Sequence, residues 1–150
     1  MIKTQKKPKR KTISQLKKDF WKVFSLYIRM RDALKTTGDI NNGKCITCGR
    51  LVPIKKADAG HFISRRYNGT LFDETNVHLQ CKKCNAFGGI LIEKEYRKQI
   101  VKKYGEGYDI QLEERAMEIK KFTPSELETL IDTYKSKIEA LKEGNKVGVV

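Results

Sequence analysis

Cys45-Ile-Thr-Cys48 and Cys81-Lys-Lys-Cys84, with 32 residues between them, are the stretches that decide the fold of this chain. A gap of two residues lets both sulfurs of one pair bind the same ion at about 2.3 Å, and two such pairs complete a tetrahedral Zn²⁺ site. The chain begins with a lysine-rich polar tract instead of an apolar signal segment, which predicts a reducing compartment. Two disulfides or four unrelated thiols are therefore the weaker alternatives, and the spacing predicts a structural zinc ion.

Three polar residues lie close to these cysteines in the sequence but are not among the predicted zinc ligands. They are His61 and Asn76, between the two pairs, and Asn85, directly after Cys84. A histidine on a strand can take a proton from water as a general base. An asparagine at the start of the next helix can bind a divalent cation, Mg²⁺ or Mn²⁺, that polarises a phosphate. A second asparagine can brace the intervening loop through backbone hydrogen bonds. A lone residue of either type is usually a surface polar group, so the order of all three carries the interpretation.

The charge of the chain indicates a polyanionic partner. The 150 residues carry a net charge of +14, and positive charge is concentrated in residues 3–11. We expect residues 1–11 to be a disordered arm that can follow phosphates without reading bases, although a solvated tail is an equal alternative. The chain has no apolar run near 18 residues, so we expect no membrane partner and a cytoplasmic location, the host cytoplasm if the protein is phage-encoded.

The apolar periodicity predicts an α+β fold in which helices flank a metal-stabilised centre. A helix beginning at the Thr12–Gln15 capping box should end near Gly38, and residues 57–64 should form the strand that carries His61. A helix beginning near Asn85 should close at Gly105. Two further helices are expected, over residues 110–121 and from Pro124 to Gly144. We therefore expect one domain over residues 12–150, with the zinc-containing centre at about residues 43–104 and the C-terminal helices at about residues 108–143.

Several segments together resemble the phage NinG (Rap) recombination family and, more widely, the HNH or ββα-metal nucleases with four zinc-binding cysteines. The matching segments are Tyr27-Ile-Arg-Met-Arg-Asp32, Cys45-Ile-Thr-Cys-Gly49, Ala59-Gly-His-Phe62, Asn76-Val-His-Leu-Gln-Cys81, Cys84-Asn85, Tyr96-Arg97 and Lys103-Tyr-Gly105. The resemblance implies a ββα-metal centre with structural zinc, and a metal-dependent DNA endonuclease that acts on branched recombination intermediates. His61 would activate water, and a divalent ion would lie near Asn85.

Two departures from the family pattern leave the ligands of that divalent ion open. Many HNH sites have a metal-binding Asp or His just before the general base, where this chain has Gly60. Asp58 lies on the same face of the strand but about 6.6 Å further back, so it could bind through water. His78 is the other candidate, and packing is an equal alternative for it. The family also tends to show Gly-Asn where this chain has Gly89-Ile90.

Basic residues flank the predicted site, namely Arg65, Arg66, Lys82 and Lys83. We expect them to position DNA by its phosphates without specifying its sequence. A non-catalytic zinc-ribbon DNA-binding recombination protein is the main alternative to a nuclease, and Gly60 is its main support. A ribosomal-type RNA-binding protein would explain the charge and the zinc but not the order of His61, Asn76 and Asn85. The sequence leaves the oligomeric state open between a monomer and a homodimer.

Overall fold

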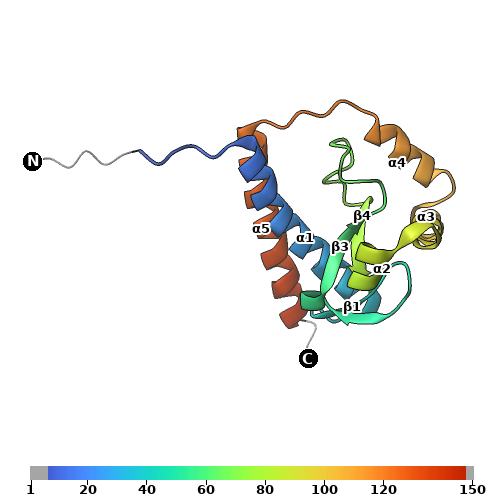
Figure 1. Ribbon diagram of the computed structural model, residues 1–150. Helices are drawn as coiled ribbons and strands as arrows, with labels where there is room; N and C mark the ends of the chain where they lie inside the picture. The colour runs from blue at the N-terminus through green and yellow to red at the C-terminus, as the bar shows by residue number, and fades with distance from the viewer. Residues whose placement is uncertain (1–6, 148–150) are drawn as a thin grey trace, which may run out of the picture.

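A computed structural model describes residues 7–147 and has the predicted α+β character (Figure 1). The described residues form five α-helices, one short 3-10 helix and two antiparallel sheets of two strands each. The helices are α1 (Ile13–Thr37), α2 (Lys82–Phe87), α3 (Gly89–Tyr104), α4 (Tyr108–Ala116) and α5 (Pro124–Val147). The strands are β1 (Asn42–Lys44), β2 (Leu51–Pro53), β3 (Ala57–His61) and β4 (Val77–Cys81), and the 3-10 helix is Ile54–Lys56. No helix within residues 7–147 is long and apolar enough to cross a membrane.

Helix α1 begins and ends where its local sequence predicts. The Thr12 hydroxyl accepts a hydrogen bond from the Gln15 backbone, and the Gln15 side chain accepts one from the Thr12 backbone, so both exposed amides are satisfied. Gly38 ends the helix with φ 76°, a left-handed conformation that suits glycine. The predicted basic arm precedes this helix; its residues 1–6 lie outside the described residues, and residues 7–11 form neither helix nor strand.

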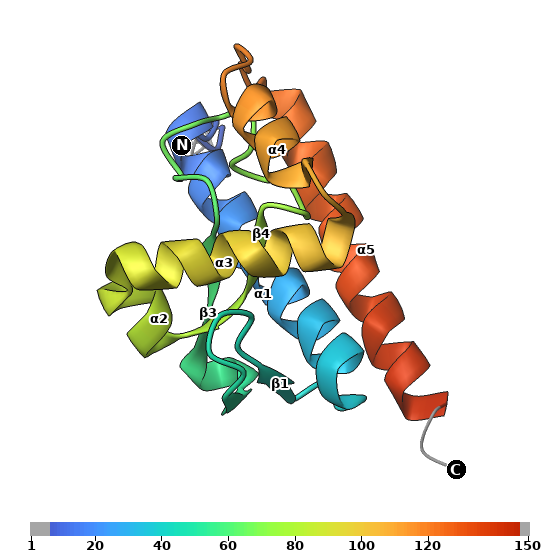
Figure 2. The same cartoon turned by 90° about the vertical axis from the view of Figure 1, so that its right-hand side faces the viewer.

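The β3–β4 hairpin lies between two helices. Its register places Asp58 opposite Gln80 and Gly60 opposite His78, so these four residues share one face. Buried apolar side chains of the other face, including Ala59 and Val77, pack into a cluster with the α1 side chains. Helix α3 crosses the hairpin on the side opposite α1, as Figure 2 shows, and its Tyr96 hydroxyl donates to the Gly60 carbonyl at 2.7 Å. The hairpin is therefore covered on both sides, and functional side chains reach solvent only at its edges and ends.

The helix predicted to begin near Asn85 is instead two helices. Helix α2 begins at Lys82, so that Cys84 and Asn85 both lie in its middle. Gly88 then follows, and Gly89 has a φ of 61°, a conformation that L side chains rarely adopt. This left-handed residue interrupts the run of helical hydrogen bonds and allows α3 to leave in a new direction before it ends at Gly105 as predicted.

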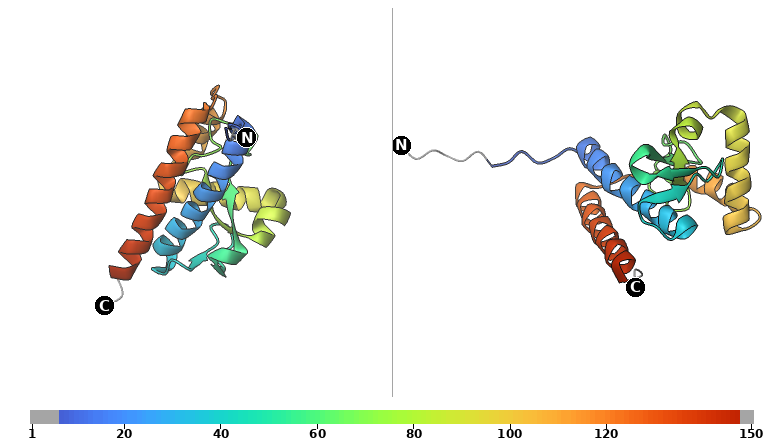
Figure 3. Two further views of the ribbon diagram at one scale, coloured as in Figure 1. Left: turned by 90° about the vertical axis from the view of Figure 1, so that its left-hand side faces the viewer. Right: turned by 90° about the horizontal axis from the view of Figure 1, so that it is seen from below.

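The C-terminal helices differ from the prediction at their boundaries. Helix α4 covers Tyr108–Ala116 instead of residues 110–121. Helix α5 begins at Pro124 as predicted but continues through Gly144 to Val147, so the prediction that Gly144 ends it was wrong. A glycine inside a helix costs only about 1 kcal/mol, which neighbouring turns and packing can offset. Helix α5 lies alongside α1 in every view, and Leu127 and Tyr134 join the α1 cluster (Figure 3).

Candidate functional site

The four cysteines come together as the spacing predicted. The sulfur atoms of all four cysteines lie within 4.8 Å of one another: Cys45, Cys48, Cys81 and Cys84. Four sulfurs placed tetrahedrally about 2.3 Å from one zinc ion would be about 3.8 Å apart. The Cys48 and Cys81 sulfurs are separated by 3.8 Å. The cluster is thus positioned to hold one metal ion, and four sulfur ligands are consistent with structural zinc.

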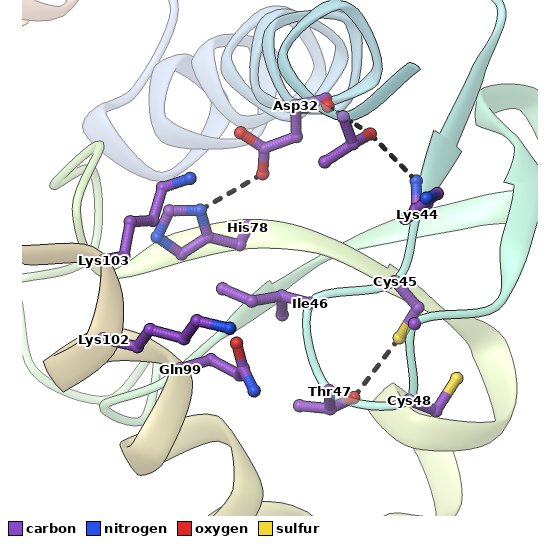
Figure 4. A pocket seen from close by; sticks show the side chains of 12 residues that line it. Asp32, Lys44, Cys45, Ile46, Thr47, Cys48, His78, Gln99, Lys102 and Lys103 are labelled. Atoms are coloured by element: carbon purple, nitrogen blue, oxygen red, sulfur yellow. Dashed lines mark hydrogen bonds and ion pairs between the residues drawn. The ribbon is translucent and has the colours of Figure 1, made fainter.

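Cys45 lies in surroundings that favour its thiolate. Burial opposes ionisation, but the backbone of Cys48 and the side chain of Thr47 stabilise the anion and lower the pKa of Cys45 to about 7. The Thr47 hydroxyl lies 3.3 Å from the Cys45 sulfur, on the loop between β1 and β2 (Figure 4). Since a thiolate only accepts hydrogen bonds, the Thr47 hydroxyl donates in the ionised state.

A second group of functional side chains lies around an open cavity of about 590 Å³, on the β3 edge of the hairpin. Three of the predicted catalytic or metal-binding residues line it: Asp58, His61 and Asn85. The cationic side chains that line the same cavity are Arg29, Lys55, Arg65 and Lys82. A hollow that combines a histidine, a carboxylate and an amide with four cationic groups can receive a phosphate.

The position and tautomer of His61 are set by two contacts. Its Nε2 lies 2.9 Å from the carbonyl oxygen of Leu71, and the Trp21 ring stacks on the imidazole with centroids 4.9 Å apart. A carbonyl only accepts, so Nε2 carries the proton and the lone pair is on Nδ1. Burial, with a smaller effect of Arg65, lowers the pKa of His61 below its usual 6.5 despite the Leu71 carbonyl. The neutral imidazole at pH 7 is the form that can accept a proton.

Asn76 braces the loop that supplies Leu71. Its side-chain oxygen accepts a hydrogen bond from the Ile63 amide at 2.7 Å, and its amide nitrogen donates to the carbonyls of Ile63 and Thr70. The residue is fully buried. Asn76 therefore holds the two ends of this loop together and does not line the cavity itself.

Asp58 and Asn85 face one another across the gap between β3 and α2. The Asn85 side-chain nitrogen donates to Asp58 Oδ2 at 3.1 Å. Carboxylate and amide oxygens are the ligands that Mg²⁺ and Mn²⁺ prefer in proteins. Asp58 and Asn85 thus offer, beside His61, the types of oxygen that a hard divalent cation binds.

His78 lies apart from this group and does not line the His61 cavity. It is 1% exposed, and Nδ1 lies 3.2 Å from Asp32 Oδ2 (Figure 4). Nε2 lies 3.1 Å from the Tyr104 hydroxyl and 3.2 Å from the Thr75 carbonyl. Burial lowers the pKa of His78, although Asp32 acts in the opposite direction. Both ring nitrogens are engaged by the chain itself, and these contacts fit the packing role that was the alternative to metal binding.

The Arg31-Asp32 pair belongs to the same buried network. Asp32 also accepts hydrogen bonds from Arg31 Nε and the Leu79 backbone, each at 2.8 Å. The guanidinium of Arg31 reaches the carbonyls of Glu74 and Val77. These contacts tie α1 to β4 and to the loop before it, which gives Arg31 and Asp32 a structural role.

The cavity also contains residues that sequence reasoning missed. Trp21, Ser25 and Arg29 lie on α1 at spacings of four, and Lys55 lies in the 3-10 helix. The spacing of four was a usable signal, because it places the three on one face of the helix. Of the four predicted DNA-binding residues, Arg65 and Lys82 line the cavity, whereas Arg66 and Lys83 are exposed outside it.

Comparison with known proteins identifies the family. No curated protein and no solved structure matches this chain. The family described as Bacteriophage Lambda NinG protein matches residues 2–144, which is nearly the whole chain. With the four-cysteine cluster and the Arg31–Asp32 network both inside the matched region, the chain belongs to the Bacteriophage Lambda NinG protein family.

Proposed function

We propose that this protein is a metal-dependent DNA endonuclease that acts on branched recombination intermediates. The observation that carries the proposal is the convergence of His61, Asp58 and Asn85 in one cationic cavity. The order of β3, β4 and α2, with cysteines at the end of β4 and inside α2, supports a ββα-metal centre braced by structural zinc.

His61 is the general base of the proposed reaction. With Nε2–H donating to the Leu71 carbonyl, Nδ1 can remove a proton from the water that attacks phosphorus. Stacking on Trp21 restricts rotation of the ring, and Asn76 holds the loop that presents Leu71. The P–O bond to the leaving deoxyribose oxygen breaks as the new bond to the water oxygen forms.

The remaining cavity residues orient the phosphate and balance its charge. A divalent cation held near Asn85, whose side chain is oriented by Asp58, would stabilise charge on the phosphate and on the leaving oxygen. Arg65 and Lys82 face the same hollow and neutralise the backbone as it enters. These contacts address phosphate and not bases, which suits an enzyme that selects DNA by shape.

A cleavage assay tests this proposal directly. Four-way, nicked, looped and linear DNA of one sequence would be incubated with the zinc-loaded protein in Mg²⁺, Mn²⁺ or EDTA. We expect metal-dependent cutting of the branched substrates, and His61→Ala should lower the rate about 10²- to 10⁴-fold. Zinc content, circular dichroism and DNA affinity of the variant should match the wild type, because among the described residues the His61 side chain hydrogen-bonds only to the Leu71 carbonyl and to neither the four cysteines nor the Arg31–Asp32 network.

Two results would contradict the proposal. Equal cutting by wild type and His61→Ala would place the nuclease site elsewhere. Retained affinity for branched DNA without any cleavage in Mg²⁺ or Mn²⁺ would favour the non-catalytic zinc-ribbon DNA-binding protein instead.

A further inference from the structure

Gly60 is the position where the sequence lacks an expected metal ligand, and its surroundings contain one from another strand. A Cβ atom added to Gly60 would overlap the side-chain oxygen of Gln80 and lie 3.0 Å from Asn85 Oδ1. Gln80 belongs to β4 and is 3% exposed. The missing side chain at residue 60 thus makes room for the Gln80 carboxamide on the same face of the hairpin.

The orientation of the Asn85 side chain follows from its partner. Asp58 is a carboxylate that only accepts hydrogen bonds when ionised, so the Asn85 nitrogen must face it, as observed at 3.1 Å. The Asn85 oxygen is then directed towards Gly60. Asp58 is therefore a positioning residue for Asn85.

The orientation of the Gln80 side chain follows from the zinc cluster. A metal-bound Cys45 thiolate accepts from the Thr47 hydroxyl at 3.3 Å, which leaves the oxygen of Thr47 to accept from Gln80 Nε2 at 3.3 Å. Figure 4 shows the hydrogen bond between Cys45 and Thr47. Because the Gln80 nitrogen donates to Thr47 beside the zinc cluster, Gln80 Oε1 points away from the cluster and towards Gly60.

Two amide oxygens therefore converge over Gly60 with nothing to donate to them. Within residues 7–147, neither Gln80 Oε1 nor Asn85 Oδ1 accepts a hydrogen bond from the protein. Adjacent carbonyl oxygens repel one another unless a donor or a cation lies between them. His61 and Asn85 line the hollow beside these oxygens together with Gln80.

We infer that Gln80 is a ligand of the divalent cation, paired with Asn85, and that its oxygen takes the place of the carboxylate or imidazole absent at residue 60. The inference rests on the proposed function, since it names the ligands of the same metal. It also connects the two metal sites, because the zinc-bound Cys45 orients Gln80 through Thr47.

Cation binding can be measured without DNA and without cleavage. Trp21 is the single tryptophan of the chain and stacks on His61, so Trp-sensitised Tb³⁺ luminescence reports a cation at this site. Displacement of Tb³⁺ by Mn²⁺ or Mg²⁺ gives their affinities in zinc-loaded protein. We expect Gln80→Met to weaken Mn²⁺ binding about 10- to 100-fold, and Gln80→Glu to retain or strengthen it.

Gly60→Ala provides an independent perturbation that leaves Gln80 chemically intact. Its Cβ would displace the Gln80 oxygen, so Mn²⁺ binding should weaken as in Gln80→Met. Gln111→Met is the matched control, because Gln111 is exposed on α4 and should leave Mn²⁺ affinity unchanged. One equivalent of zinc in every variant confirms that the fold is intact.

The outcomes separate this inference from the proposed function. Wild-type Mn²⁺ affinity retained in both Gln80→Met and Gly60→Ala would overturn the inference alone. Absence of Mn²⁺ binding in the wild type would overturn both proposals. Mn²⁺ binding that depends on Gln80 in a protein that cuts no DNA would support this cation site and overturn the nuclease.

Discussion

Asp32→Asn tests whether the buried network of α1 and β4 stabilises the fold as its contacts indicate. Asp32 is 5% exposed and accepts from Arg31 Nε, the Leu79 amide and His78 Nδ1. An asparagine has one acceptor oxygen in place of two and carries no charge, so Arg31, 7% exposed, would lose its nearest anion. Removing one partner of a buried ion pair typically costs about 3–5 kcal/mol.

The expected loss is large enough for equilibrium unfolding to measure. A domain of this size is typically stable by about 5–15 kcal/mol, so about 3 kcal/mol is a substantial share. With a urea slope of about 1–3 kcal/mol/M, the midpoint should fall by about 1–3 M at constant zinc concentration. Asp19→Asn is the matched control, because Asp19 pairs with Lys11 at the solvent-screened surface and its loss should leave the urea midpoint nearly unchanged.

The pH dependence of the free energy of unfolding provides a second test of the same network. Burial alone would raise the pKa of Asp32, but hydrogen bonds from His78 and Arg31 outweigh it and hold the pKa well below its usual 3.8. A lowered folded-state pKa contributes stability that is fully present above pH 3.8 and is lost as the pH falls further. The free-energy gap between wild type and Asp32→Asn should therefore not shrink from pH 7 down to that point, where Asp32 also favours protonated His78, and it should narrow below it. A gap under about 1 kcal/mol at pH 7 would refute the reasoning.

Three further predictions follow from the zinc cluster, the basic arm and the general base. Cys84→Ser should reduce bound zinc to less than about half an equivalent by elemental analysis and unfold the protein, because binding of structural zinc is coupled to folding; full zinc content with an intact fold would contradict this. Deleting residues 1–11 removes six positive charges, so the slope of log affinity for DNA against log salt should become less steep by up to about 5; an unchanged slope would show that the arm does not contact phosphate. Because burial lowers the pKa of His61, DNA cleavage should lose half its rate only below pH 6.5 as the base becomes protonated, and a half-point above 6.5 in the pH profile of kcat/KM would contradict this assignment.

The sequence by itself determined the features that depend on local spacing. Two cysteine pairs with two-residue gaps predicted the cluster that the structure shows, because each pair can bind one ion from a single turn. The Thr12 capping box and Gly38 predicted both ends of α1, since capping hydrogen bonds involve only neighbouring residues. The order of His61, Asn76 and Asn85 similarly predicted candidates for one site, of which His61 and Asn85 line the same cavity.

Local spacing was a poor guide where tertiary packing or a single dihedral angle decided the outcome. Gly144 lies inside α5 because packing of that helix along α1 offsets the low helix propensity of one residue. Gly89 divides the helix that begins after β4 because its φ is positive, which the sequence allowed but did not require.

The tertiary structure alone decided the roles of the polar residues around the hairpin. His78 and Gln80 both alternate onto the Gly60 face of β4, and the sequence marked only the histidine as a candidate ligand. Asp32, which lies 46 positions earlier on α1, engages the His78 ring, whereas Gln80 faces the space over Gly60. Trp21 was not a candidate site residue in the sequence, yet it stacks on a histidine 40 positions away. Strand register and helix packing bring such distant residues into contact, and these long-range arrangements are set by the buried surface of the whole chain and not by the spacing within any one segment.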